Sequence, residues 1–229
     1  MKKGLLLCIF LAIGFFGWFK NFSLYNFWRP YSPTKIIKEP RQFLVDAMKY
    51  LHEIPASEKR ALDLGAGAGH DTAYLLKNGW QVWAIDEEKE STDFLQKRED
   101  IVPYTKSLKV MNTAFIDLPW DTFSQLRFYL MYAAFSLPFM TRHNFFIVLP
   151  KIVDSLSPGG FFIGTFFGSD HQAFHWWVNM RMTFLTRQEC LDLFNTLKIH
   201  VFEEYHQKND RGYYEHFFTV VAFKPFGLK

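Results

Sequence analysis

The sequence predicts an α/β fold in which helices cover both faces of a mostly parallel sheet. Three observations support this prediction. Short apolar runs alternate with segments of helical pattern along the chain. One apolar run, residues 60–64, leads directly into a glycine-rich turn. Another, residues 128–134, is almost uninterrupted, as expected for a strand that helices cover on both faces. The 229 residues are enough to bury a full core.

The strands follow from their local patterns. Five apolar runs predict five strands, and two further runs on either side of a turn signal at residues 209–212 predict a C-terminal hairpin. The Ser-Pro-Gly-Gly sequence at residues 157–160 is expected to turn the chain into the fifth strand. The predicted strands are residues 60–64, 80–85, 108–114, 128–134, 161–167, 198–205 and 216–223.

Helices are expected before and between these strands. The first comes after Pro40, where residues 43, 44, 47 and 51 are apolar at helical spacing. The second follows the glycine turn and stops at Asn78, and the next two are residues 88–100 and 143–155. The last is expected from Thr186 to Leu197, because Thr186 and Glu189 have the spacing of a capping box.

The most informative motif is the segment Asp63 to Gly69, with glycines at every second position from Gly65. Glycine can adopt positive φ and lets the backbone approach a ligand, and the N–H groups at the start of the following helix face that ligand. Asp86 ends the second predicted strand, where a carboxylate accepts hydrogen bonds from a ribose diol. The motif therefore predicts a nucleoside-bearing ligand. The alternative is an ordinary turn whose glycines serve packing.

The glycine spacing separates the classes of nucleoside-binding protein. Dinucleotide-binding proteins use G-x-G-x-x-G, but here His70 stands at the position of the third glycine. The phosphate-binding signature G-x-x-x-x-G-K-[ST] is also missing. A nicotinamide-dependent oxidoreductase is thus disfavoured and stays open as an alternative. A non-catalytic nucleoside-binding module at a membrane is the other alternative.

The pattern D-x-G-x-G-x-G after a strand resembles the class I methyltransferases that bind S-adenosylmethionine, as does the Leu-x-Pro-Gly-Gly sequence before the fifth strand. The resemblance covers about residues 40–225. It implies a Rossmann-like sheet of seven strands, mostly parallel, with an antiparallel C-terminal strand. It also implies S-adenosylmethionine as cofactor and methyl transfer as the activity.

The resemblance also implies roles for eight residues, position by position. Asp117 alone has a clear alternative, because Asp is common in turns before proline. The implied contacts are the methionine end of the cofactor for Asp63, Gly65, Gly67 and Gly69, the ribose for Asp86 with Glu87, and the adenine for Asp117 and Phe115.

Three further segments resemble small bacterial methyltransferases of the tellurite-resistance type. They are residues 136–139, 167–170 and 182–186. In the first, Leu137 replaces the first proline of the motif with which methylases of adenine or glutamine hold an amide, so an amide acceptor is doubtful. The resemblance implies a small-molecule methyl acceptor without identifying it.

The loop at residues 168–181 follows the fifth predicted strand, where ligands bind in such sheets. It is rich in polar and aromatic groups, and Asp170, His171 and Trp176 are the candidate acceptor-site residues. The alternative is a surface loop without chemistry. His171 and His175 have helical metal-ligand spacing, but no third ligand is near in sequence, so no metal site is expected.

The first 39 residues form a segment separate from the domain expected at residues 40–229. Gly4 to Phe19 is apolar and uncharged, and aromatic residues typical of a membrane interface follow it. No small-x-small cleavage site follows, and more Lys and Arg come after this run than before it. We expect a membrane anchor with the catalytic domain in the cytoplasm. The alternatives are a signal peptide, and a mis-assigned start or a buried helix.

The amino-acid composition of the chain limits the classes of molecule that it is expected to bind. The formal charge of +3 comes without any block of basic residues, so nucleic-acid binding is not expected. The two cysteines give no disulfide framework, and the oligomeric state cannot be predicted.

Overall fold

The computed structural model describes residues 39–171, 181–208, 212 and 214–227. The α-helices in these ranges are α3 (Gln42–Leu51), α4 (His70–Lys77), α5 (Lys89–Lys97), α6 (Trp120–Leu126), α7 (Arg142–Ser155) and α9 (Arg187–Asp192). Short 3-10 helices are η1 (Ala56–Glu58), η2 (Val102–Ser107), η3 (Phe115–Asp117) and η4 (Leu137–Phe139). The strands are β1 (Arg60–Leu64), β2 (Gln81–Asp86), β3 (Leu108–Asn112), β4 (Phe128–Ala133), β5 (Leu156–Gly168), β6 (Phe184–Leu185), β7 (Lys198–Lys208) and β8 (Tyr214–Phe223).

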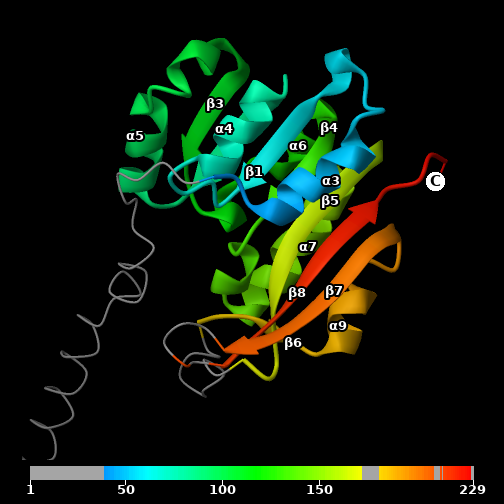
Figure 1. The fold of residues 1–229 in the computed structure, drawn as a ribbon. Helices are drawn as coiled ribbons and strands as arrows, with labels where there is room; N and C mark the ends of the chain where they lie inside the picture. Colours follow the sequence, from blue (N-terminus) through cyan, green and yellow to red (C-terminus); the bar gives the residue numbers. More distant parts are fainter. Residues whose placement is uncertain (1–38, 172–180, 209–211, 213, 228–229) are drawn as a thin grey trace, which may run out of the picture. The chain divides into compact units, whose positions relative to one another are not determined.

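The strands form one twisted sheet in the order β3-β2-β1-β4-β5-β8-β7 (Figure 1). All neighbours from β3 to β5 are parallel, and β8 is antiparallel to both β5 and β7. The predicted fold class is therefore confirmed, including the seven strands and the antiparallel last strand. The difference is the two-residue strand β6, which pairs with the end of β5 and makes the sheet eight-stranded.

Helices cover both faces of the sheet and bury two apolar cores. One core joins the sheet to α3, α4 and α5, and the other joins it to α6, α7 and α9. Strand β4 contributes to both, because successive side chains of a strand point to opposite faces. Leu130 and Tyr132 enter the first core, and Met131 and Ala133 enter the second. The continuous apolar character of this strand follows directly from that arrangement.

The helix boundaries differ from the predictions mainly at the carboxyl ends. The helix predicted at residues 88–100 ends at Lys97, and the one predicted to reach Leu197 ends at Asp192. The start of the latter is as predicted: the Thr186 hydroxyl accepts the N–H of Glu189 at 3.2 Å, and the Thr186 N–H donates to the Glu189 carboxylate at 2.8 Å. The capping box is thus confirmed.

The predicted turn at residues 157–160 lies inside β5 as an irregularity of its pairing. The register with β4 passes from Phe128 opposite Leu156 to Leu130 opposite Phe161, so the extra residues bulge out of the ladder. The C-terminal hairpin is longer than predicted, because β7 and β8 remain paired as far as Lys208 and Tyr214.

The expected anchor at residues 4–19 lies outside the described residues, as does almost all of the expected N-terminal segment. Within the described part of the chain, no helix combines the length and the apolar character needed to cross a membrane.

Candidate functional site

The candidate site lies at the carboxyl ends of β1, β2 and β4. The strand order reverses between β1 and β4, because the chain runs outward from β1 to β3 and then returns to the other side of β1. Ligands bind at such a reversal in open α/β sheets, since the connections leave in opposite directions and open a crevice. The glycine turn follows β1 at this position.

All three glycines of the turn have positive φ, with values of +79° at Gly65, +54° at Gly67 and +75° at Gly69. They differ in their surroundings. A Cβ on Gly65 would overlap the Cβ of Ser136, and one on Gly69 would approach Leu95 at 2.7 Å. A Cβ on Gly67 would meet nothing within 4 Å. The first and third glycines thus permit close packing, and the second faces open space.

Asp86 and the glycine turn are joined by a direct hydrogen bond. The N–H of Gly67 donates to Asp86 Oδ2 at 2.8 Å, and the N–H of Glu88 donates to Oδ1 at 2.9 Å. Burial raises the pKa of Asp86, and these two hydrogen bonds oppose the shift. The carboxylate is therefore held rigidly beside the open space at Gly67, with lone pairs left on each oxygen.

The other predicted cofactor residues surround the ends of β2 and β3. Glu87 follows Asp86 and is exposed; partial burial and the charge of Asp86 raise its pKa. Phe115 and Asp117 lie in η3 after β3, where Phe115 is half-buried and Asp117 is exposed. The carbonyl of Phe115 accepts the indole N–H of Trp120 at 2.9 Å, which fixes this turn.

Asp63 lies behind the turn and not at its surface. Only 2% of the residue is exposed, and its carboxylate accepts the hydroxyl of Thr72 at 2.5 Å. Burial raises the pKa of Asp63 to about 7; the hydrogen bond from Thr72 and the charge of Arg41 oppose this shift, and Asp71 and Asp86 support it. Asp63 thus connects β1 to the first turn of α4.

An ion pair beside Asp63, between the partly exposed Arg41 and the buried Asp71, was not predicted from the sequence. The guanidinium of Arg41 contacts the Asp71 carboxylate, which also accepts the Arg41 N–H at 2.9 Å and the Tyr132 hydroxyl at 2.8 Å. Burial lowers the pKa of Arg41, but Asp71, Tyr132 and Asp63 outweigh it, so that the net shift is upward. Burial, followed by the charge of Asp71, raises the pKa of Tyr132 well above its ordinary value. This network fixes the start of α3 against the start of α4 and against β4.

The end of β4 is pinned to both neighbouring strands. The Ser136 hydroxyl donates to the carbonyl of Leu64 at 2.6 Å, and the N–H of Phe135 donates to the Thr165 hydroxyl at 2.6 Å. Phe135 has a φ of +49°, which is unfavourable for a residue with a side chain. Such strain persists only where the surroundings impose it, and here both hydrogen bonds do so.

An aromatic cluster extends from this point along the ends of β4, β5 and β8. We define it as Phe135, Phe139, Phe167, Phe184 and Phe217, which pack around Met182. Its ring centroids are 5.5 Å apart for Phe135 and Phe217, and 5.2 Å for Phe139 and Phe167. The cluster supplies an apolar wall beside the carboxyl ends of β4 and β5.

The two predicted acceptor residues that the structure describes, Asp170 and His171, have different neighbours. The His171 ring lies 4.9 Å from that of Phe167, in contact with the aromatic cluster, and burial lowers its pKa. Asp170 is exposed and turns toward β8, where its N–H donates to His216 Nδ1 at 3.0 Å. Trp176 lies outside the described residues. The structure thus places His171 at the aromatic cluster and Asp170 at His216.

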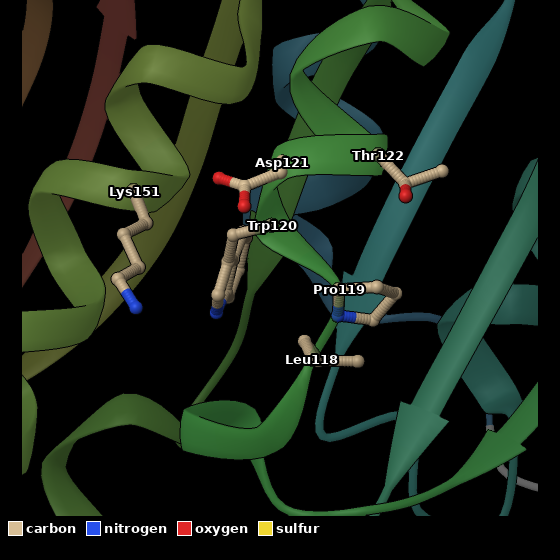
Figure 2. A pocket seen from close by; sticks show the side chains of 6 residues that line it. All are labelled: Leu118, Pro119, Trp120, Asp121, Thr122 and Lys151. Atoms are coloured by element: carbon tan, nitrogen blue, oxygen red, sulfur yellow. The ribbon is translucent and has the colours of Figure 1, made fainter.

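A depression of about 240 Å³ lies elsewhere, between the start of α6 and α7 (Figure 2). Lys151 of α7 lies on one side and the first residues of α6 on the other. None of the predicted cofactor or acceptor residues lines it, so we do not assign it to the site. Its lining residues are Leu118, Pro119, Trp120, Asp121, Thr122 and Lys151.

Comparisons with known proteins agree with this geometry. Residues 40–203 match the family described as "Tellurite resistance protein TehB". The chain is similar to the crystal structure of TehB from Haemophilus influenzae, with a TM-score of 0.65 and 17% identity. That alignment covers 87% of this chain and 66% of the Haemophilus chain, slightly less than two thirds of its length. A comparison with curated proteins found no match.

Two further similar structures carry ligands. The 1,6-didemethyltoxoflavin-N1-methyltransferase of Burkholderia thailandensis, with 1,6-didemethyltoxoflavin and S-adenosylhomocysteine bound, has a TM-score of 0.59 and 20% identity, and the alignment covers 80% of this chain and 78% of that one. The magnesium protoporphyrin IX methyltransferase of Synechocystis, with S-adenosylmethionine bound, has a TM-score of 0.56 and 14% identity, covering 79% and 78%. Each is a methyltransferase with the fold seen here. The match over residues 40–203 shows that the chain belongs to the TehB family.

Proposed function

We propose that this protein transfers a methyl group from S-adenosylmethionine to a small molecule. The single observation that carries the proposal is the open space at Gly67, directly beside the fixed carboxylate of Asp86. Backbone without side chains next to an oriented carboxylate is what a nucleoside ligand requires. Membership of the TehB family and the methyltransferases of similar fold support the same function.

The residues present fit this cofactor. Gly67 and the neighbouring backbone leave room for its methionine end, and Asp86 holds the ribose, with Glu87 nearby. Asp117 is exposed and can accept from the adenine amino group, while Phe115 packs on the base. Bound S-adenosylmethionine supplies an electrophilic methyl group on a sulfonium. Asp63, being buried against Thr72, shapes the turn and holds the methionine end indirectly.

We assign the methionine carboxylate to Arg41. Its guanidinium is paired with Asp71 and keeps 44% of the side-chain surface exposed, so part of its donor capacity faces outward. The guanidinium carbon of Arg41, Cζ, lies 5.8 Å from the centre of the Phe135 ring, at the end of β4. A cation held there can pair with a carboxylate at the carboxyl edge of the sheet.

The acceptor binds against the aromatic cluster in this proposal. An apolar wall excludes water and holds an acceptor with an apolar body close to the methyl group, which is the main requirement of an in-line displacement. His171 contacts the cluster, and its lowered pKa leaves the imidazole neutral at pH 7 and able to accept a proton from an acidic acceptor. Asp170 and Trp176 remain predicted acceptor residues.

The test compares two glycines with similar backbone conformation and open surroundings, of which one lies in the proposed cofactor turn and the other does not. Gly67 and Gly79 both have positive φ, +54° and +81°, and a Cβ on either would meet nothing within 4 Å. Alanine therefore costs similar backbone strain at both positions, but only Gly67 lies in the proposed cofactor turn. We expect Gly67→Ala to weaken S-adenosylmethionine binding by about tenfold or more, and Gly79→Ala to leave it unchanged.

Calorimetric titration of the full chain with S-adenosylmethionine and with NAD measures this difference. A methyl-transfer screen over thiol, chalcogen, amine and hydroxyl acceptors then identifies the acceptor class. Binding of NAD without S-adenosylmethionine, or equal affinities in the two alanine variants, would overturn the proposal.

We also propose, from the sequence, that Gly4 to Phe19 attaches the protein to a membrane with the catalytic domain on the cytoplasmic side. The apolar run and the excess of basic residues after it support this orientation. Membrane fractionation with protease protection tests it. Recovery of the full-length chain in the soluble fraction would refute it.

A further inference from the structure

Two histidines and a glutamate share one face of the C-terminal hairpin. His206 of β7 and His216 of β8 are directly opposite each other in the antiparallel pair, and Glu204 lies two residues before His206 on the same face. The two imidazole rings stack, with centroids 4.1 Å apart. Glu204 Oε1 lies 3.0 Å from His216 Nε2 and 3.3 Å from His206 Nε2. One carboxylate thus contacts both rings.

The hydrogen bonds determine which nitrogen of each neutral ring carries the proton. The N–H of Asp170 donates to Nδ1 of His216, so this ring carries its proton on Nε2 and donates it to Glu204. In His206, Nε2 likewise faces the carboxylate, and Nδ1 accepts the hydroxyl of Tyr214 at 2.9 Å. Both Nδ1 atoms therefore carry a lone pair, and Glu204 fixes both rings in this tautomer.

Asp170 adds a second carboxylate from the end of β5. Its Oδ2 lies 3.9 Å from His216 Nδ1, and one ligand atom each from Asp170, His206 and His216 lie within 4.8 Å of one another. Ligands bound to a divalent transition metal at about 2.1 Å lie roughly 3.4 Å apart in a tetrahedral site. Binding an ion therefore requires the two stacked rings to rotate until both Nδ1 atoms point at it, and it replaces the two hydrogen bonds to Nδ1.

We propose that Asp170, His206 and His216 form a site for a divalent transition metal of the zinc type. Two imidazoles and one carboxylate match the ligand preference of such ions, and a carboxylate on the far nitrogen of each ring is the usual outer-shell partner. Glu204 fills that outer position for both rings. The inference rests on this geometry and is independent of the methyltransferase proposal.

The packing around His216 holds its imidazole ring in a fixed position. Its ring lies against Gly168 at the end of β5, where any Cβ would overlap the imidazole. His216 is 2% exposed, whereas His206 and Asp170 are exposed, so a metal has access from solvent. A bound ion would connect the segment after β5 to the hairpin. It would thereby fix the position of His171, which follows Asp170 and contacts the aromatic cluster.

The experiment titrates the full chain, purified without a histidine tag, with Zn²⁺ by calorimetry. Co²⁺ serves as a second probe, because its absorption spectrum reports the coordination. The test variant is His206→Gln, whose side chain is exposed on the hairpin. The matched control is His143→Gln, an exposed histidine on α7. Affinity for S-adenosylmethionine, measured on the same samples, verifies the fold and tests the proposed function separately.

We expect one Zn²⁺ per chain, a loss of affinity of about 100-fold in His206→Gln, no change in His143→Gln, and about tenfold weaker binding in Glu204→Gln. Equal affinities in His206→Gln and wild type, or an equal loss in His143→Gln, would overturn the inference. Absence of Zn²⁺ binding below about 100 μM in the wild-type chain would do so too, whatever its affinity for S-adenosylmethionine.

Discussion

The buried carboxyl of Asp63 makes the free energy of unfolding depend on pH. A single substitution, Asp63→Asn, removes this contribution and so measures it. Burial raises its pKa from 3.8 to about 7. The pKa is higher in the folded than in the unfolded chain, so the stabilising contribution of protonation is complete below pH 3.8 and is lost as pH rises through about 7. Asparagine cannot ionise, yet it keeps an oxygen that can accept the Thr72 hydroxyl.

The expected size follows from the two pKa values. Between pH 5 and pH 8, a group that shifts from 3.8 to about 7 on folding loses about 2.6 kcal/mol of stabilisation. We therefore expect Asp63→Asn to gain about 2 to 3 kcal/mol in free energy of unfolding relative to wild type over this range. Other titrating groups cancel in the comparison, because both chains contain them.

Urea denaturation followed by tryptophan fluorescence, at pH 5, 6, 7 and 8 without cofactor, measures this difference. Asp121→Asn is the control for replacing one carboxyl by an amide at the surface, because this residue is exposed. A difference between wild type and Asp63→Asn that stays constant within about 0.5 kcal/mol would show that the carboxyl is not held protonated.

Three further outcomes are expected. Asp86→Ala should weaken S-adenosylmethionine binding by about 1–3 kcal/mol in calorimetry, because the ribose hydroxyls lose their charged partner; unchanged affinity would contradict the ribose assignment. Gly65→Ala should lower the melting temperature more than Gly67→Ala does, since its Cβ overlaps Ser136; equal melting temperatures would refute that packing argument. His171→Ala should lower the rate or raise the acceptor KM while cofactor affinity stays within a few tenths of a kcal/mol; an equal loss of cofactor binding would mean that the residue is structural.

The geometry of the proposed cofactor side of the site was predictable because its signals are local. The positive φ values at Gly65, Gly67 and Gly69 follow from the need for a tight turn between a strand and a helix. Asp86 ends the next strand, and parallel pairing of β1 with β2 brings it to the turn. Spacing along the sequence thus determines proximity in space here.

The ion pair of Arg41 and Asp71 could not be predicted from local sequence patterns. The two residues are 30 positions apart, and Tyr132 is 61 positions beyond Asp71. Asp71 did carry a signal, an acidic residue in the first turn of a helix, but that position is also explained by the helix dipole. Without the packing of α3 against β4, nothing in the sequence distinguishes this partly buried pair from two solvated charges.

The acceptor side depends on a register that no motif encodes. Phe217 and His216 are neighbours in β8, so they point to opposite faces of the sheet. One joins the aromatic cluster and the other joins His206 and Glu204. A slip of β8 by one residue would exchange the two side chains and remove both arrangements. The long pairing of β8 with β5 and β7 fixes that register, and the aromatic cluster proposed to bind the acceptor and the proposed metal site therefore depend on the same strand.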